Sequence, residues 1–227
     1  MNTDTSSALR VAVTGGTSGL GLALVRALHA RGARVAFVAR DAARVQRVAA
    51  ELPGTHGIAG DIANKDDTHR IAMQISAALG GLDVLVNNAS SLGPVPLALL
   101  ADTDCEALET ALAANLVGPF RLTKALLGAL GAAAREGRSA RIVNITSDAA
   151  VSAYARWGAY GASKAALAQL SHIWDEELRE HGVRVMNFDP GDMDTPLHAL
   201  ALPDTDPATL KRPADSAREL LALLELA

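Results

Sequence analysis

The chain has 227 residues, of which 49% are hydrophobic and 20% are charged, and its formal net charge is -4. This balance is typical of a globular protein, and the interspersed charges exclude the basic footprint of a nucleic-acid binder. Cys105 is the only cysteine, so an intramolecular disulfide is excluded, and the cysteine and histidines lack zinc-site spacing, so no metal is expected. Residues 1–8 form a polar tail without the features of a signal peptide, and no apolar run reaches the ~20 residues of a membrane span. We therefore expect a cytoplasmic protein that binds neither nucleic acid nor a membrane.

The first apolar segment, residues 9–13, predicts a buried strand. It is followed by the glycine-rich residues 14–21 and then by an amphipathic segment. Strand, glycine-rich turn and helix are the context that a phosphate-binding loop requires. Gly15 permits a tight turn, Gly19 lets the backbone approach a pyrophosphate, and Gly21 lets the helix pack on the strand. The pyrophosphate would lie at the helix N-terminus, although a tight turn of this kind needs glycine in any case.

The rest of the chain alternates between apolar strands and amphipathic helices. Further strands are predicted at 34–39, 55–60, 82–86, 141–147 and 182–188, and helices at 22–31, 42–52, 65–79, 104–131, 160–180 and 214–226. This alternation predicts a single α/β domain over residues 1–227, built as a Rossmann-type doubly wound parallel sheet with helices on both faces and ligands at the carboxyl ends of the strands. Residues 192–213 have few periodic apolar residues, so we expect a substrate-covering loop with little regular structure.

The most informative stretch runs from a buried strand through Ser147 to a helix that carries Tyr160 and Lys164. Tyr160 and Lys164 are four residues apart and therefore share one face of the helix. A phenol has an ordinary pKa of roughly 10, and a neighbouring ammonium group should lower it by favouring the phenolate. Ser147 could donate a hydrogen bond to a substrate oxygen that Tyr160 also holds. Such a set suits proton transfer to or from a carbonyl or alcohol oxygen, whereas a Tyr-x-x-x-Lys pair alone is usually only a helix surface.

Three motifs together resemble the short-chain dehydrogenases/reductases. They are the Ser/Tyr-x-x-x-Lys set, the loop Thr-Gly-x-x-x-Gly-x-Gly, and Asn87-Asn88-Ala89 at the end of the predicted fourth strand. Ser90 departs from the glycine that the family usually has after this motif. The resemblance implies an NAD(P)-dependent oxidoreductase that reversibly transfers hydride between nicotinamide and a carbonyl or secondary alcohol of a small, mainly apolar substrate.

The resemblance also assigns roles to individual residues. The catalytic residues would be Ser147, Tyr160 as the general acid and base, Lys164 and Asn115. Asn115 would interrupt a helix and hold a water in a proton relay. Those that contact the cofactor would be Gly15, Thr17, Ser18, Gly19, Leu20, Gly21, Arg40, Asp61, Ile62, Asn87, Ala89, Tyr160, Lys164, Pro190, Gly191 and Thr195. Taken alone, Asp61 could instead cap the helix over 65–79, and Asn115 could be a capped or surface residue.

Cofactor choice depends on the end of the second strand. An acidic residue there accepts hydrogen bonds from the ribose 2′-hydroxyl, whereas a basic one favours a 2′-phosphate. Arg40 lies where many NADP-preferring relatives have arginine, so NADP(H) is favoured. Asp41 keeps NAD(H) possible, and both residues could simply be a solvated pair that opens the next helix.

Three further expectations concern substrate and assembly. Tyr154, Arg156 and Trp157, which lie between Ser147 and Tyr160, are candidate substrate residues. A homodimer through the helices near 104–131 and 160–180 is expected, whereas the seventh strand that relatives usually have is not seen, which makes a tetramer doubtful. The alternative function is a non-catalytic dinucleotide-sensing regulatory protein on the same fold.

Overall fold

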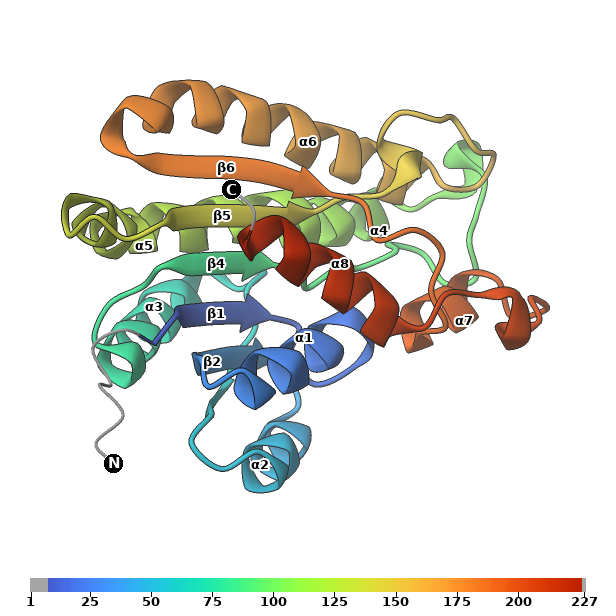
Figure 1. Ribbon diagram of the computed structural model, residues 1–227. Coiled ribbons are helices and arrows are strands. Elements are labelled where there is room, and N and C mark those ends of the chain that lie inside the picture. Colours follow the sequence, from blue (N-terminus) through green and yellow to red (C-terminus); the bar gives the residue numbers. More distant parts are fainter. Residues whose placement is uncertain (1–7, 226–227) are drawn as a thin grey trace.

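Residues 8–225 are described by the computed structural model, and within them six parallel strands form one sheet (Figure 1). The strands are β1 (Arg10–Thr14), β2 (Arg34–Ala39), β3 (His56–Ala59), β4 (Val84–Asn87), β5 (Ala140–Ile145) and β6 (Val183–Phe188). Their order across the sheet is β3-β2-β1-β4-β5-β6, so the chain reverses its direction of winding between β1 and β4. The predicted Rossmann-type fold is confirmed, and no seventh strand is present in the described part. The polar tail predicted for residues 1–8 lies outside the described residues except for Ala8.

The strands are nearly continuous apolar runs because both faces of the sheet are covered. All of β5 is buried, and so are four of the five residues of β1. Val11 pairs with Val35 on one side and with Val84 on the other. This parallel register brings the carboxyl ends of the strands to the same edge of the sheet.

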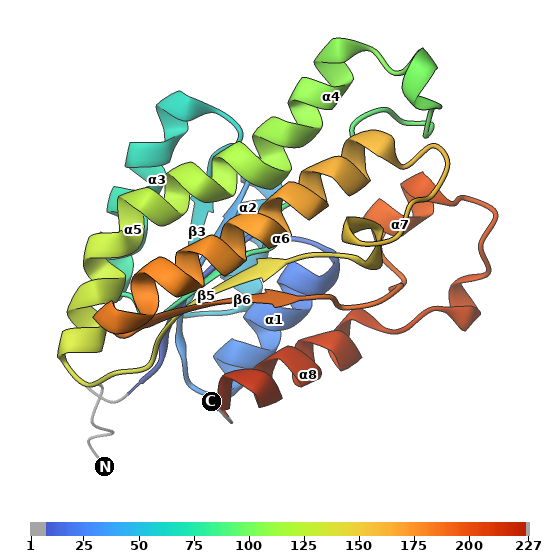
Figure 2. The same cartoon turned by 90° about the horizontal axis from the view of Figure 1, so that it is seen from above.

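Helices cover the two faces of the sheet (Figure 2). One face carries α1 (Gly19–Ala30), α2 (Ala42–Glu51) and α8 (Pro213–Glu225), and the other carries α3 (Lys65–Leu79), α5 (Gly118–Arg135) and α6 (Gly158–Leu178). The core is mostly aliphatic, and Phe37 is the largest of its fully buried side chains. No helix in residues 8–225 is long and apolar enough to cross a membrane.

The helix predicted at 104–131 is interrupted. It consists of α4 (Cys105–Leu112), a π-helical turn (Ala113–Val117) and α5. Pro119 has no N–H group to donate to the carbonyl of Asn115 four residues earlier, which explains why the α-helical pattern breaks here.

The expectation of little regular structure in residues 192–213 is wrong in part. The helix α7 (Pro196–Ala201) lies within this segment. Thr195 caps it by accepting a hydrogen bond from the N–H of His198 at 3.1 Å, and Pro196 occupies its first turn. Thr followed by Pro is a sequence signal for a helix start, and it was outweighed by the scarcity of apolar residues.

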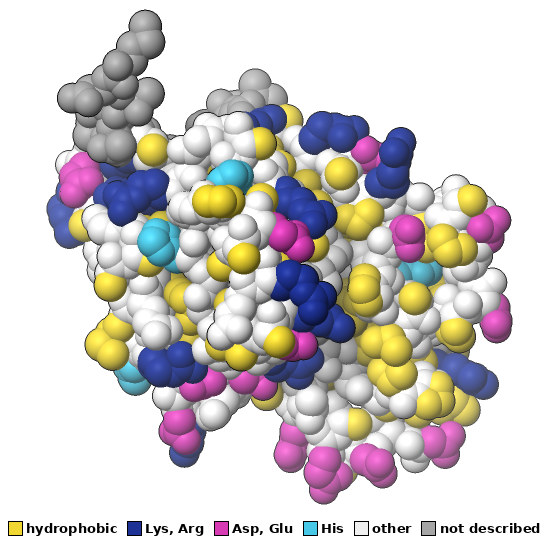
Figure 3. All heavy atoms as spheres, turned by 90° about the horizontal axis from the view of Figure 1, so that it is seen from below, with side chains coloured by type: hydrophobic (Ala, Val, Ile, Leu, Met, Phe, Trp, Pro, Cys, Tyr) yellow, Lys and Arg dark blue, Asp and Glu magenta, His cyan; other side chains and the backbone are white. Residues whose placement is uncertain are grey.

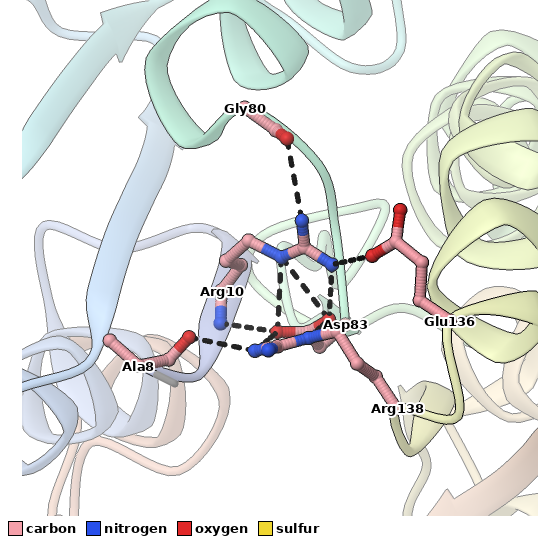
Figure 4. Close-up of polar contacts among 6 residues, drawn as sticks. All are labelled: Ala8, Arg10, Gly80, Asp83, Glu136 and Arg138. Carbon is pink, nitrogen blue, oxygen red and sulfur yellow. Dashed lines mark hydrogen bonds and ion pairs between the residues drawn. The ribbon is translucent and has the colours of Figure 1, made fainter. Parts of the chain in front are cut away.

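The amino ends of the strands are joined around the buried carboxylate of Asp83 (Figure 4). Asp83 precedes β4, and it accepts hydrogen bonds from Nη2 of Arg10 at 2.8 Å and from Nη2 of Arg138 at 2.7 Å. Arg10 also approaches Glu136 at 3.6 Å. Burial raises the pKa of Asp83, but the hydrogen bonds from Arg138 and Arg10 outweigh it and lower this pKa to about 2. This cluster fixes the register of the strands at the edge opposite their carboxyl ends.

Candidate active site

A cleft of about 880 Å³ lies at the carboxyl ends of the strands. The loops that follow all six strands of the described sheet contribute to its lining, as expected for a doubly wound sheet. The face seen from below has Lys and Arg side chains near its middle, and hydrophobic side chains gather to the right, where α7 lies (Figure 3). The cleft therefore has a more basic end near α2 and a more apolar end near α7.

The glycine-rich loop forms the base of this cleft. Gly19 has a φ of +49°, and a Cβ there would lie 3.1 Å from Cγ2 of Thr195. A Cβ on Gly21 would lie 2.2 Å from the carbonyl oxygen of Gly15, so only glycine lets α1 approach β1 this closely. Ser18, at the N-cap of α1, makes no side-chain capping hydrogen bond, and the first turn contains no acidic residue. The backbone N–H groups in the first turn of α1 are therefore free of a side-chain cap. Together with the positive end of the helix dipole, they suit an anionic pyrophosphate.

At the basic end of the cleft, the two residues that follow β2 make different contacts. Asp41 caps α2, because its Oδ1 accepts the N–H of Arg44 at 3.0 Å and its Oδ2 lies 3.4 Å from Nε of Arg44. Arg40 lines the cleft with an exposed side chain and has no ion pair within the described residues. Asp61 also lines the cleft, but Asn64 is the residue that caps α3, so the capping alternative for Asp61 is wrong.

The paired asparagines after β4 join neighbouring strands. Nδ2 of Asn87 donates to Oδ1 of Asn144 at 2.8 Å, and Nδ2 of Asn88 donates to the carbonyl of Thr14 at 2.8 Å. Asn88 and Ala89 line the cleft, whereas Asn87 is buried below it. The asparagine side chains thus tie the strand ends together, and the predicted cofactor residue Asn87 does not line the cleft.

Ser147 lies at the apolar end of the cleft, directly after β5. Its hydroxyl donates to Oδ1 of Asp148 at 3.0 Å and accepts the N–H of Ala149 at 3.2 Å. The other oxygen of Asp148 accepts the hydroxyl of Tyr154 at 2.7 Å. Sequence analysis missed Asp148, although its position next to a candidate catalytic serine was a signal.

Tyr160 and Lys164 face the same cleft from α6, with only 9% and 2% of their surfaces exposed. Nζ of Lys164 donates to the carbonyl of Ile145 at 2.7 Å and lies 5.5 Å from the centre of the Tyr160 ring. Burial raises the pKa of Tyr160 to about 12 and outweighs its hydrogen bonds with Ser147 and Ser90, which lower it. Burial also lowers the pKa of Lys164 to about 8. The expectation that the ammonium lowers the pKa of Tyr160 is therefore wrong for the protein alone, because burial dominates.

Asn115 is buried within the π-helical turn, which excludes the surface alternative. Its Nδ2 donates to the carbonyl of Ser91 at 2.7 Å and to Oγ of Ser163 at 2.8 Å. Its Oδ1 accepts the N–H of Ser91 at 2.7 Å and the hydroxyl of Ser90 at 3.1 Å. Asn115 thus joins the loop after β4 to the first turns of α6, which carry Tyr160, and Ser90 extends this network into the cleft.

Most of the predicted site residues line this one cleft. They are Gly15, Thr17, Ser18, Gly19, Leu20, Arg40, Asp61, Ile62, Ala89, Ser147, Tyr154, Trp157, Tyr160, Lys164, Pro190, Gly191 and Thr195. Four others do not: Gly21, Asn87, Asn115 and Arg156. Gly21, Asn87 and Asn115 support the lining from behind, whereas Arg156 is exposed in the left-handed region with a φ of 73°. No group of His, Cys, Asp and Glu within residues 8–225 could hold a metal ion.

The doubly wound sheet and the glycine-loop cleft at its carboxyl edge are features of the Rossmann class of folds. Residues 10–205 match the family model described as short chain dehydrogenase, and the chain belongs to this family. L-fucose dehydrogenase of Rattus norvegicus is 37% identical over 117 residues, which are 52% of this chain and 43% of that enzyme. The chain thus matches less than half the length of this curated relative.

Solved structures resemble the whole fold. A 3-ketoacyl-(acyl-carrier-protein) reductase from Brucella melitensis, complexed with NADH, has a TM-score of 0.87 at 26% identity, over 96% of this chain and 90% of that one. An NADPH-bound carbonyl reductase from chicken fatty liver has a TM-score of 0.85 at 25% identity, over 97% and 92% of the two chains. The chain therefore shares its family with short-chain dehydrogenases and its fold with reductases whose structures hold a nicotinamide dinucleotide.

Proposed function

We propose that this protein is an NADP(H)-preferring oxidoreductase that interconverts a carbonyl and a secondary alcohol on a small, mainly apolar substrate. The observation that carries this proposal is the meeting of Ser147, Tyr160 and Lys164 in the cleft that begins at the glycine-rich loop. A purely dinucleotide-sensing protein would not need a proton donor beside its nicotinamide position. Turnover of any carbonyl substrate would exclude that alternative.

A bound nicotinamide would supply or accept a hydride, that is, one hydrogen together with the two electrons of the reaction. In reduction, Tyr160 donates its phenolic proton to the substrate oxygen, and in oxidation it takes this proton back. Ser147 exchanges its hydrogen bond to Asp148 for one to the substrate oxygen and so orients the carbonyl. Lys164 would hold the ribose of a bound cofactor, and Asn115 would support a proton path to solvent through the π-helical turn.

The proposed preference for NADP(H) rests on the different contacts of the neighbouring residues Arg40 and Asp41. The carboxylate of Asp41 accepts the backbone N–H of Arg44 in the first turn of α2 and pairs with the Arg44 side chain. It is therefore less available to accept a hydrogen bond from a ribose hydroxyl. Arg40 has no such partner within the described residues and lines the cleft, so it can form charge-assisted hydrogen bonds with a 2′-phosphate. The relatives do not decide the matter, because one solved structure holds NADH and another NADPH.

Calorimetric titration with NADPH and NADH tests this assignment. We expect tighter binding of NADPH, and Arg40→Ala should weaken it about 10- to 100-fold, because hydrogen bonds to charged groups are worth about 1.5–3 kcal/mol. NADH affinity should change little. Arg47→Ala is the matched control, since Arg47 is exposed on α2 and does not line the cleft. Tighter NADH binding, or equal losses for both cofactors in Arg40→Ala, would refute the preference, and binding of neither would refute the proposed function.

The substrate would lie between the loops after β5 and β6 and the segment 192–213, which we propose covers it. Tyr154 and Trp157 line this part of the cleft, and so do Leu92 and Leu197. Because Arg156 is exposed and absent from the lining, we assign it no direct contact with a substrate.

We also propose a homodimer through the helices α4, α5 and α6. Phe120 on α5 is 36% exposed and stacks on Trp174 of α6, with ring centres 5.3 Å apart. Ile173, on the neighbouring surface of α6, is 45% exposed. A second copy would cover these apolar groups. Light scattering should give a dimer mass, and Phe120→Asp should shift it to the monomer mass; an unchanged mass would count against this interface.

A further inference from the structure

Asp148 presents a fixed carboxylate at the substrate end of the cleft. Oδ1 accepts the hydroxyl of Ser147 at 3.0 Å, and Oδ2 accepts the hydroxyl of Tyr154 at 2.7 Å. The hydrogen bond from Tyr154 lowers the pKa of Asp148 most, so the carboxylate is ionised at neutral pH. A carboxylate has about four acceptor positions, so each oxygen can still accept a further donor from a ligand.

The other charged groups around Asp148 make this end of the cleft negative. Asp189 and Asp192, in the loop after β6, line the same wall, and Asp192 is near enough to Tyr154 to raise its pKa. The basic side chains of the described lining at this end are Lys164 and His198, the latter on α7. Lys164 is buried and donates to a backbone carbonyl. An anionic substrate would be repelled here, whereas a cationic one would be attracted.

Aromatic rings give a second, independent indication of a cationic ligand. The chain has two tyrosines and two tryptophans, and both tyrosines and one tryptophan line this end of the cleft. Trp157 packs its ring edge-on to Tyr160, with centres 5.6 Å apart. Aromatic rings attract an ammonium group within about 6 Å of the ring centre, and Trp does so most strongly. A carboxylate among aromatic side chains therefore suits an ammonium group better than a neutral polar group.

We propose that Asp148 receives a protonated amine of the substrate, so that the substrates are amino ketones and the corresponding amino alcohols. This inference rests on the proposed function, because it places the reacting oxygen on Ser147 and Tyr160. Oγ of Ser147 lies only 3.0 Å from Oδ1 of Asp148, so the amine is attached within a few bonds of the reacting carbon. Asp148 is thus a specificity-determining residue, whereas Ser147 and Tyr160 carry the reaction.

The test compares NADPH-dependent reduction of matched ketones of one carbon skeleton. They carry a primary ammonium, a hydroxyl or a carboxylate group on the carbon next to the carbonyl. We expect kcat/KM for the ammonium ketone to exceed that for the hydroxyl ketone about 10-fold or more, with the carboxylate ketone lowest. Asp148→Asn should reduce the ratio of ammonium to hydroxyl ketone at least about 5-fold, which is part of that gain.

The ratio is the decisive quantity, because any disturbance of Ser147 affects both ketones alike. Asp194→Asn is the matched control, since Asp194 is an exposed carboxylate of the same loop as Asp192 but does not line the cleft. It should leave the ratio unchanged. Equal rates for the ammonium and hydroxyl ketones, or a ratio that survives Asp148→Asn, would overturn the inference and leave the proposed function intact. If no ketone of the series or of a wider carbonyl panel is reduced, the proposed function fails, and this inference fails with it.

Discussion

Replacement of Asp83 by asparagine removes the negative charge that joins the amino ends of the strands (Figure 4). The Asp83 side chain is 1% exposed, and those of Arg10 and Arg138 are 14% and 23% exposed, so both arginines would lose the buried carboxylate that compensates their partly buried charge. The pKa of Asp83 falls from 3.8 to about 2 in the folded protein. At about 1.4 kcal/mol per pKa unit, this difference corresponds to about 2–3 kcal/mol of stability. Breaking a buried pair by removing one partner costs about 3–5 kcal/mol. We therefore expect Asp83→Asn to lower the free energy of unfolding by about 3 kcal/mol.

Urea denaturation at neutral pH measures this loss, and its pH dependence tests the cause. Because the folded pKa is lowered, the contribution of Asp83 is fully present above 3.8 and is lost as the pH falls through about 2. The difference in the free energy of unfolding between wild type and Asp83→Asn should therefore become smaller as the pH falls from 3.8 to about 2. Glu51→Gln is the control, since the pair of Glu51 with Arg26 is exposed and should contribute less than about 1 kcal/mol. A loss for Asp83→Asn no larger than the control, or a gap that widens with acid, would refute the reasoning.

Three further predictions concern the cleft. Tyr160→Phe should lower kcat about 10²- to 10⁴-fold without loss of NADPH binding, and a rate close to wild type would exclude Tyr160 as the proton donor. Ser90→Gly removes a hydrogen bond that lowers the pKa of Tyr160, so this pKa should rise. The pH range in which the rate of alcohol oxidation increases should therefore move to higher pH; a shift to lower pH would contradict this. Gly21→Ala should destabilise the protein by about 1–3 kcal/mol and weaken NADPH binding, because its Cβ would lie 2.2 Å from the carbonyl oxygen of Gly15. Gly128→Ala, at an exposed helical position with nothing within 4 Å, should instead be neutral or stabilising in the same thermal unfolding assay.

The fold was predictable because its signals are local. The strand Arg34–Ala39 and the helix Lys65–Leu79 have the bounds that the sequence predicted. The strand is a continuous apolar run, and the helix begins after the capping residue Asn64 and ends at Gly80 in the left-handed conformation. The glycine-rich loop and the Ser/Tyr/Lys spacing could likewise be recognised in the sequence, since each motif begins within a few residues of a strand end.

Tertiary arrangement decided what the sequence left open. The engagement of Asp41 with its own helix, which leaves Arg40 facing the cleft, depends on rotamers that no local pattern specifies. The role proposed for Asp148 depends on how the loop brings Tyr154, six residues later, back onto its carboxylate. Asn115 could be singled out, but its four hydrogen bonds go to Ser90, Ser91 and Ser163, which are 25, 24 and 48 residues distant.

The protonation of Tyr160 follows from the same tertiary burial. Proximity to Lys164 predicted a lowered pKa, yet the phenol is buried, with Asp189 and Asp148 nearby, and its pKa rises to about 12. The lysine loses part of its influence because burial lowers its own pKa to about 8. At neutral pH the ligand-free site therefore holds a protonated phenol, which is the form that donates a proton to a carbonyl oxygen. The ligand-free protein thus holds Tyr160 in the form that the proposed reduction needs, and the proposed oxidation would need positive charge from a bound ligand or an alkaline pH to release the phenolic proton.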